Sequence, residues 1–115
     1  MTVRSWLDAR RPDPPAELRA RIDAALGPAR DDDGDVAEAC LAAGERLVRE
    51  LLRDNATSRD SALDLLAADA LVTYAFEAAS QRPAALEAHA RRTMARIAAI
   101  AGEPRNVTIA SEHPR

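Results

Sequence analysis

Apolar residues recur every three or four positions along most of this chain, which is the spacing that predicts amphipathic α-helices. The clearest case runs from 36 to 53, where charged residues occupy the other faces. Asp35 precedes it as an N-cap residue. The sequence therefore predicts a helix over 36–53 with one apolar stripe, made of Val36, Ala37, Cys40, Leu41, Gly44, Leu47, Val48, Leu51 and Leu52.

The segment 59–80 has a different pattern, because its apolar side chains spread around most of a helical circumference. Such a helix is typical of the buried centre of a fold. Ser58 or Asp60 can start it. We expect neighbours to cover this helix on nearly all sides, and its large apolar residues are Leu63, Leu65, Leu66, Leu71, Val72, Tyr74 and Phe76.

A last helix is predicted over 83–101, opened by Pro83 and stopped at Gly102. The connection at 81–82 is so short that the last two helices should form an antiparallel hairpin. Acidic residues on the first of them and arginines on the second are expected to favour this hairpin modestly. The predicted inner face of the last helix is Leu86, Ala90, Met94, Ile97 and Ala101.

Two shorter helices are predicted before residue 30. Thr2 can cap a helix over residues 3 to 10, which the following prolines end. Asp13, as an N-cap residue before Pro14, predicts a second helix over 14–26 that Gly27 and Pro28 close.

Together these segments predict an all-α fold, a small up-and-down bundle of four to five helices. The abundance of Ala and the presence of only four Gly favour helix throughout. We expect a single helical domain over 1–102, with 1–11 as an N-terminal arm helix, and a flexible tail over 103–115.

The charge of the chain gives it no general attraction to nucleic acid or to anionic membranes. The net charge is −3, and all 16 basic residues are Arg. The arginines of the last helix have no aromatic residue among them for base stacking. No apolar run is long enough to span a bilayer. A single cysteine, Cys40, fits a reducing compartment, and we expect a cytoplasmic protein.

The densest group of carboxylates is Asp31-Asp32-Asp33-Gly34-Asp35. Aspartates so close together can hold Ca²⁺ or Mg²⁺. An EF-hand loop aligned on Gly34 would need an acid at 29 and a Glu at 40, where this chain has Ala29 and Cys40. We interpret the segment as a solvated loop whose last acid caps a helix, and predict no metal and no cofactor.

A second candidate is the polar edge of the helix over 59–80, formed by Asp69, Thr73 and Glu77. Two carboxylates on one face could bind a ligand or do acid–base chemistry inside a bundle. The other interpretation is that this edge faces solvent. No Glu-x-x-His or Glu-x-x-Glu spacing accompanies it, and His89 and His113 have no partners at metal-ligand spacing.

The segment Leu65-Leu-Ala-Ala-Asp-Ala-Leu-Val-Thr-Tyr-Ala-Phe-Glu77 resembles one helix of the trans-polyprenyl diphosphate synthases, over about 13 of the 115 residues. The Asp-Asp-x-x-Asp magnesium motifs of that family do not occur in this chain. No site residue is therefore carried over from the resemblance.

We expect a non-enzymatic helical domain that binds another protein or itself as a homodimer. Ala buries little apolar area, so a core this rich in Ala gains from a second copy. The alternative is a small helical enzyme or ligand-binding domain that uses Asp69, Thr73 and Glu77.

Overall fold

The structure, a computed structural model, describes residues 1–54 and 57–103 of the 115-residue chain. The described residues form five α-helices and one 3-10 helix, with no strand among them. They are α1 (Val3–Asp8), α2 (Ala16–Leu26), η1 (Gly27–Asp31), α3 (Val36–Asp54), α4 (Arg59–Ser80) and α5 (Pro83–Ala101). The predicted all-α bundle is confirmed. The predicted flexible tail lies, from residue 104 on, outside the described residues.

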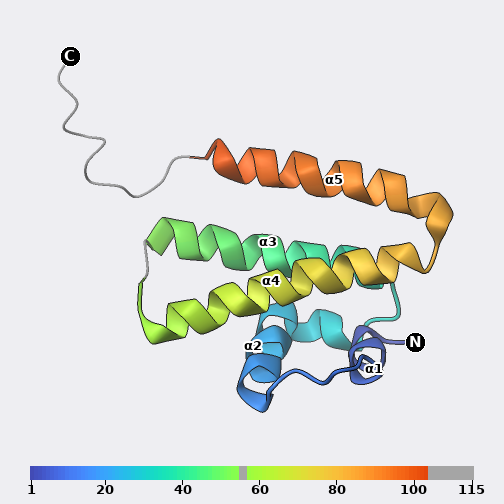
Figure 1. The fold of residues 1–115 in the computed structure, drawn as a ribbon, viewed down its shortest axis with the longest axis horizontal. Coiled ribbons are helices and arrows are strands. Elements are labelled where there is room, and N and C mark those ends of the chain that lie inside the picture. Colours follow the sequence, from blue (N-terminus) through green and yellow to red (C-terminus); the bar gives the residue numbers. More distant parts are fainter. Residues whose placement is uncertain (55–56, 104–115) are drawn as a thin grey trace.

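The three long helices α3, α4 and α5 run antiparallel, each beside the next (Figure 1). The N-terminal elements α1, α2 and η1 lie against α3 and α4 on the side opposite α5 (Figure 1). The α3–α4 pair is therefore covered by different elements on its two sides. Within the described ranges, no helix has the apolar length that crossing a bilayer requires.

The α3–α4 contact is made largely by small residues. The buried positions of α4 are Ala67, Ala68, Leu71, Ala75 and Ala79. Gly44 of α3 faces them so closely that a Cβ there would lie 3.3 Å from Cγ2 of Val72. Small side chains let the two helix backbones approach, which compensates in packing for the small area that each alanine buries.

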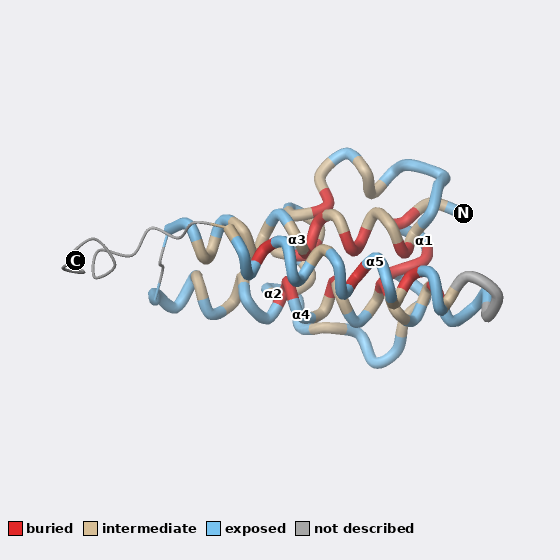
Figure 2. The backbone as a smooth tube through the Cα atoms, turned by 90° about the horizontal axis from the view of Figure 1, so that it is seen from above, coloured by how far each residue is buried: buried red, intermediate tan, exposed pale blue. Residues whose placement is uncertain are grey.

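The N-terminal helices contribute the large apolar side chains of the core. Trp6 packs edge-on against Tyr74 of α4, with ring centroids 5.9 Å apart, and its Nε1 donates to Gln81 Oε1 at 3.1 Å. The Arg10 guanidinium stacks over the indole at 4.1 Å. The other large buried residues of this part are Val3, Leu7, Ile22 and Leu26. Figure 2 shows buried positions concentrated in the middle of the molecule, whereas α5 is largely exposed or half-buried.

Local chemistry determines where the helices begin. Thr2 and Ser58 each form a capping box, with Ser5 and Ser61, and Oδ1 of Asp35 accepts from the Glu38 N–H at 3.1 Å. These three predicted caps are confirmed.

The predicted N-cap of α2, Asp13 before Pro14, is wrong. Helix α2 begins at Ala16 after Pro15, while Asp13 pairs with Arg11 at 2.8 Å. The predicted stop at Gly27 holds for the α-helix, since Gly27 adopts φ +57°. The chain then continues as η1 through Asp31, so the polar loop is shorter than predicted.

Candidate functional site

Helix α5 is joined to α3 by a network of ion pairs. Arg96 Nη2 lies 2.7 Å from Glu38 Oε2, and Arg96 Nε lies 3.5 Å from Glu45 Oε1. Arg49 bridges Glu45 and Glu103, which follows α5, at 2.6 Å each. The hydrogen bond that Arg96 donates to Glu38 is the main cause that raises the pKa of Arg96. We call these five residues the α3–α5 ion-pair network.

Two polar side chains lie where α5 meets α4. His89 is fully buried, and its ring packs edge-on against Phe76 with centroids 4.7 Å apart. Thr93, also buried, donates from Oγ1 to the His89 carbonyl at 2.9 Å. Nδ1 of His89 has no hydrogen-bond partner within the described part of the chain. Burial is the main cause that lowers the pKa of His89, and Arg92 adds to it, so the imidazole is neutral.

The inner face of α5 is therefore not the predicted one. Its buried residues are His89, Thr93 and Ile100, with Arg96 half-buried beside them. The prediction of an inner face through Leu86, Ala90, Met94, Ile97 and Ala101, here called the α5 stripe, is wrong. Met94 stays 64% exposed and Ile97 50% exposed. The ion-pair network and the His89–Phe76 contact fix the rotation of the helix, which leaves Leu86 and Ala90 half-buried and the rest of the α5 stripe exposed.

A groove of about 280 Å³ runs between α5 and the α3–α4 pair. Apolar residues from all three helices line it, among them Val48, Leu52, Val72, Ile97 and Ile100. Among the described residues that line it, the charged ones are Glu45 and Arg96, which already pair with each other. Because Ile97 and Ala101 belong to both, the groove and the α5 stripe form one continuous apolar surface.

Apolar exposure extends to the first half of α4. Leu65 is 59% exposed and Leu66 56% exposed. The prediction that α4 is covered on nearly all sides is wrong at this end, where both leucines remain exposed. Leu65 lies on the same helical face as Val72 and Phe76, which is the face turned toward α5.

The structure places Asp69, Thr73 and Glu77 on an exposed edge of α4. Thr73 Oγ1 donates to the Asp69 carbonyl at 2.9 Å, a bond within the helix. None of the three lines the groove. Among described contacts, neither carboxylate forms an ion pair.

The expected charge pairing between α4 and α5 is also absent from the described contacts. Asp60 and Asp64 of α4 bind Arg21 of α2, at 3.1 Å and 2.7 Å. Arg96 of α5 binds α3 instead. The acidic edge of α4 and the remaining arginines of α5 are thus left facing solvent.

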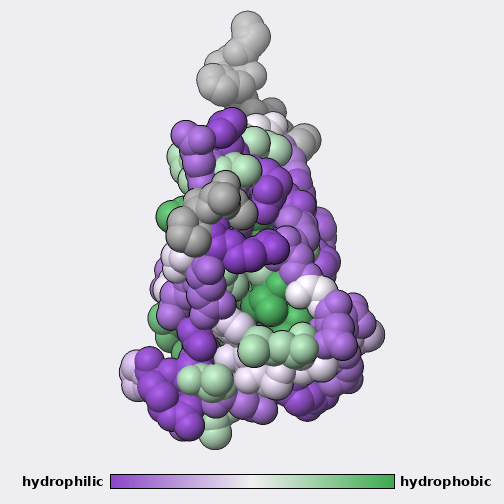
Figure 3. Space-filling model, turned by 90° about the vertical axis from the view of Figure 1, so that its right-hand side faces the viewer, coloured by the Kyte–Doolittle hydropathy of each residue, from purple (hydrophilic) through white to green (hydrophobic). Residues whose placement is uncertain are grey.

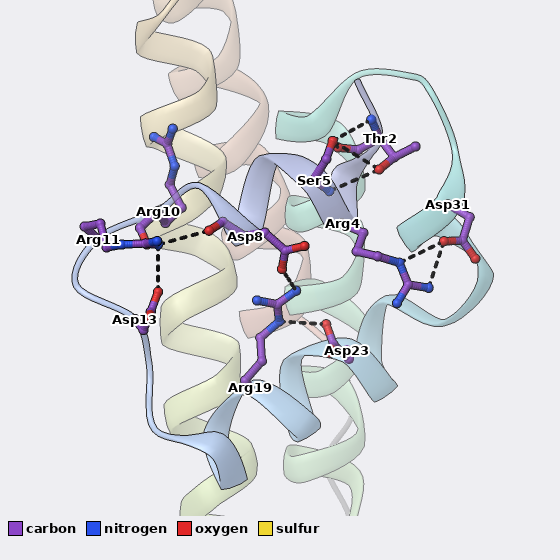
Figure 4. A network of polar contacts seen from close by, with 10 residues as sticks. All are labelled: Thr2, Arg4, Ser5, Asp8, Arg10, Arg11, Asp13, Arg19, Asp23 and Asp31. Carbon is purple, nitrogen blue, oxygen red and sulfur yellow. Dashed lines mark hydrogen bonds and ion pairs between the residues drawn. The ribbon is translucent and has the colours of Figure 1, made fainter.

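The aspartate segment 31–35 has structural partners. Arg4 binds Asp31 at 2.8 Å as part of the polar network in Figure 4, and the N-terminal amine lies 3.2 Å from Asp33. Asp35 caps α3. In the ranges that can be described, no three His, Cys, Asp or Glu side chains converge as metal ligands. Cys40 is fully buried, and burial raises its pKa to about 12, so it is no nucleophile.

A second hollow, of about 360 Å³, lies at the end of the bundle where the N-terminus meets the start of α3 and the end of α4. Figure 3 shows this end, with apolar atoms at the bottom of a hollow and a hydrophilic rim. Its polar groups bind one another, as in the bond from Trp6 to Gln81 and the contact of Arg82 with Asp35 at 4.0 Å. The hollow therefore offers a ligand few unoccupied polar partners.

Sequence reasoning missed the ion-pair network and the buried His89–Thr93 pair. A signal for them exists, since His89, Thr93, Arg96 and Ile100 recur at intervals of four, three and four. Comparison with family models, curated proteins and solved structures finds no match to this chain. The fold places this chain in the class of small all-α bundles. The functional interpretation rests on the exposed apolar surface formed by the α5 stripe and the groove.

Proposed function

We propose that this chain is a non-enzymatic helical assembly domain that pairs with a second copy of itself through the α5 stripe. The observation that carries the proposal is the rotation of α5. Its inner face carries His89, Thr93 and Arg96, and the apolar side chains of Met94 and Ile97 are left exposed to water. Contiguous exposed apolar surface of this kind marks interaction sites on folded proteins, and its burial stabilises an assembly by about 25 cal/mol for each Å².

A protein partner fits this surface better than a small ligand does. Ligand pockets usually enclose about 300–1,000 Å³ and place a few free polar groups to orient the ligand. The groove is slightly smaller, and its charged residues already pair with each other. A helix laid along the α5 stripe would cover both the stripe and the groove.

The alternative use of Asp69, Thr73 and Glu77 as a ligand-binding or catalytic group gains no support from the geometry. All three are exposed, and neither of the two hollows described above is lined by them. We also place the proposed assembly in the cytoplasm, where a lone buried thiol such as Cys40 stays reduced.

The mass in solution tests this proposal. Sedimentation equilibrium of the wild-type chain at micromolar concentration should give about twice the chain mass of 12.4 kDa. The double variant Met94→Asp with Ile97→Asp should give the monomer mass, because it puts charges into the apolar contact. A matched control, Ala88→Asp with Ala95→Asp, changes exposed positions on the far side of α5 and should leave the dimer intact.

Circular dichroism of each variant shows whether the helices are retained. A folded wild-type chain that remains monomeric at high micromolar concentration would contradict the proposal. So would equal loss of the dimer in the stripe variant and in its control.

A further inference from the structure

The α5 stripe is built to fit its own rotated copy. Two antiparallel α5 helices, aligned about a two-fold axis between Thr93 and Met94, place Leu86 level with Ala101 and Ala90 level with Ile97. Each large side chain then meets a small one, and the two Met94 side chains meet near the axis. Self-complementarity of this kind is what a two-fold interface between identical chains requires.

The contact between α4 and α5 fixes which residue of α4 stands beside this axis. The ring of Phe76 lies against that of His89. Because the helices are antiparallel and have the same rise per residue, seven positions back from Phe76 correspond to seven positions on from His89. Asp69 is therefore level with Arg96.

An arginine of the second copy stands at the level of Asp69 and Arg96 along the helix axis. Arg91 is as far from Leu86 as Arg96 is from Ala101, so in the antiparallel pair Arg91 of the second copy stands level with Arg96 of the first. Arg91 flanks the α5 stripe one turn from Met94. Asp69 lies one turn from Leu65, at the border of the α4 face that is turned toward α5.

Both side chains are exposed, and neither is held in a buried contact. Arg91 is exposed and has one described ion pair, to Glu87 on its own helix at 3.2 Å. Asp69 is exposed and has none among the residues that the structure describes. The acidic residues of α4 and the arginines of α5 do not pair within one described chain. In the antiparallel dimer they can pair between the two copies.

From this placement we infer that the partner of the α5 stripe is a second copy with its α5 antiparallel, and that Arg91 of each copy pairs with Asp69 of the other. The inference rests on the proposed function and adds to it the orientation of the partner and the residues that select it. A two-fold axis makes each Arg91–Asp69 contact twice, so one substitution changes two contacts. Charges at the rim of an interface govern specificity more than affinity.

Charge reversal tests the pairing. Arg91→Glu and Asp69→Arg should each weaken the homodimer roughly tenfold, because each places two like-charge contacts in it. An equimolar mixture of the two variants should form a heterodimer as tight as the wild-type dimer, because it contains one Arg91–Asp69 contact and one contact with the two charges exchanged. Arg92→Glu is the matched control, since Arg92 lies on the same helix facing away from the α5 stripe, and it should leave the affinity unchanged.

Cysteine crosslinking tests the orientation. Met94→Cys should form a disulfide-linked dimer on mild oxidation, because the two residues meet near the axis. Ala88→Cys, on the opposite face of α5, should not. A dimer that dissociates on substitution of Met94 and Ile97, but responds to neither charge reversal nor their mixing, overturns this inference and leaves self-association standing. A monomeric wild-type chain overturns both.

Discussion

The two sides of the α3–α4 pair are held by different kinds of contact. On one side, α1 and α2 bury large apolar side chains such as Trp6 and Ile22, each at most 3% exposed. On the other, α5 is joined by ion pairs and by the contact of buried His89 with Phe76, while Met94 and Ile97 remain exposed to water. One side of the α3–α4 pair is therefore held mainly by buried apolar side chains, and the other side mainly by polar contacts.

This difference predicts unequal stability. Full burial of a large aliphatic side chain stabilises a fold by about 1.5–3 kcal/mol, whereas a partly exposed ion pair contributes about 0–1 kcal/mol. We expect α5 to open before the N-terminal helices do, because local stability follows the density of buried apolar contacts. An interaction helix held in this way can also adjust its position when a partner binds.

The largest expected effect comes from matched isoleucine truncations on the two sides. Ile22→Ala should lower the free energy of unfolding by about 2–5 kcal/mol, because Ile22 is completely buried and leaves a cavity. Ile97→Ala should change it by less than about 0.5 kcal/mol when the chain is monomeric. Urea unfolding at low concentration measures both, and equal losses would remove the proposed difference between the sides.

A smaller effect is expected from breaking the α3–α5 ion-pair network. Arg96→Gln should lower the stability by about 1 kcal/mol, since the side chain is about a third exposed and binds two carboxylates. Amide hydrogen exchange should become faster in α5 and stay unchanged in α2. Arg91→Gln, which removes a largely exposed pair within α5, is the control at concentrations where the chain is monomeric, and there it should alter neither rate; faster exchange in both helices would argue against a separate α5 unit.

The smallest effect concerns pH. Burial lowers the pKa of His89, so the unfolded chain takes up a proton at a higher pH than the folded chain does. The stability from the neutral imidazole is present above the ordinary histidine pKa of about 6.5 and decreases as the pH falls through it. Asp35, which caps α3, and Glu38 of α3 oppose this shift, whereas Arg92 and Arg96 of α5 reinforce it.

Thermal melts between neutral pH and mildly acidic pH measure this dependence. His89→Gln should flatten the curve over that range. A wild-type melting temperature that does not fall on acidification would show that α5 tolerates an imidazolium in this position.

The sequence was sufficient for the helices because their limits depend on local chemistry. The caps at Thr2, Asp35 and Ser58 act within three residues, and Gly27 ends α2 through its own backbone conformation. The start of α2 was missed because three prolines in close succession allow several first residues. Residues close in sequence therefore determine whether a helix forms and where it begins and ends.

The rotation of α5 could not be predicted from α5 alone. The α5 stripe and the true inner face both recur at helical spacing, and the apolar stripe is the usual choice for a core. Glu38 and Glu45, more than fifty positions before Arg96, decide between the two faces. The exposed edge at Asp69 was likewise open to two interpretations until the neighbours of α4 were known.

Trp6 has a consequence for how this protein can be observed. It is the only tryptophan of the chain, and it lies buried beside Tyr74 on the side away from the groove. Its fluorescence therefore reports on the environment of α1 and is almost insensitive to the unfolding of α5. Circular dichroism, by contrast, counts every helical residue equally. An unfolding curve followed by fluorescence alone would therefore not detect an early unfolding of α5. The difference between the transition midpoints of fluorescence and circular dichroism would show how independently α5 unfolds.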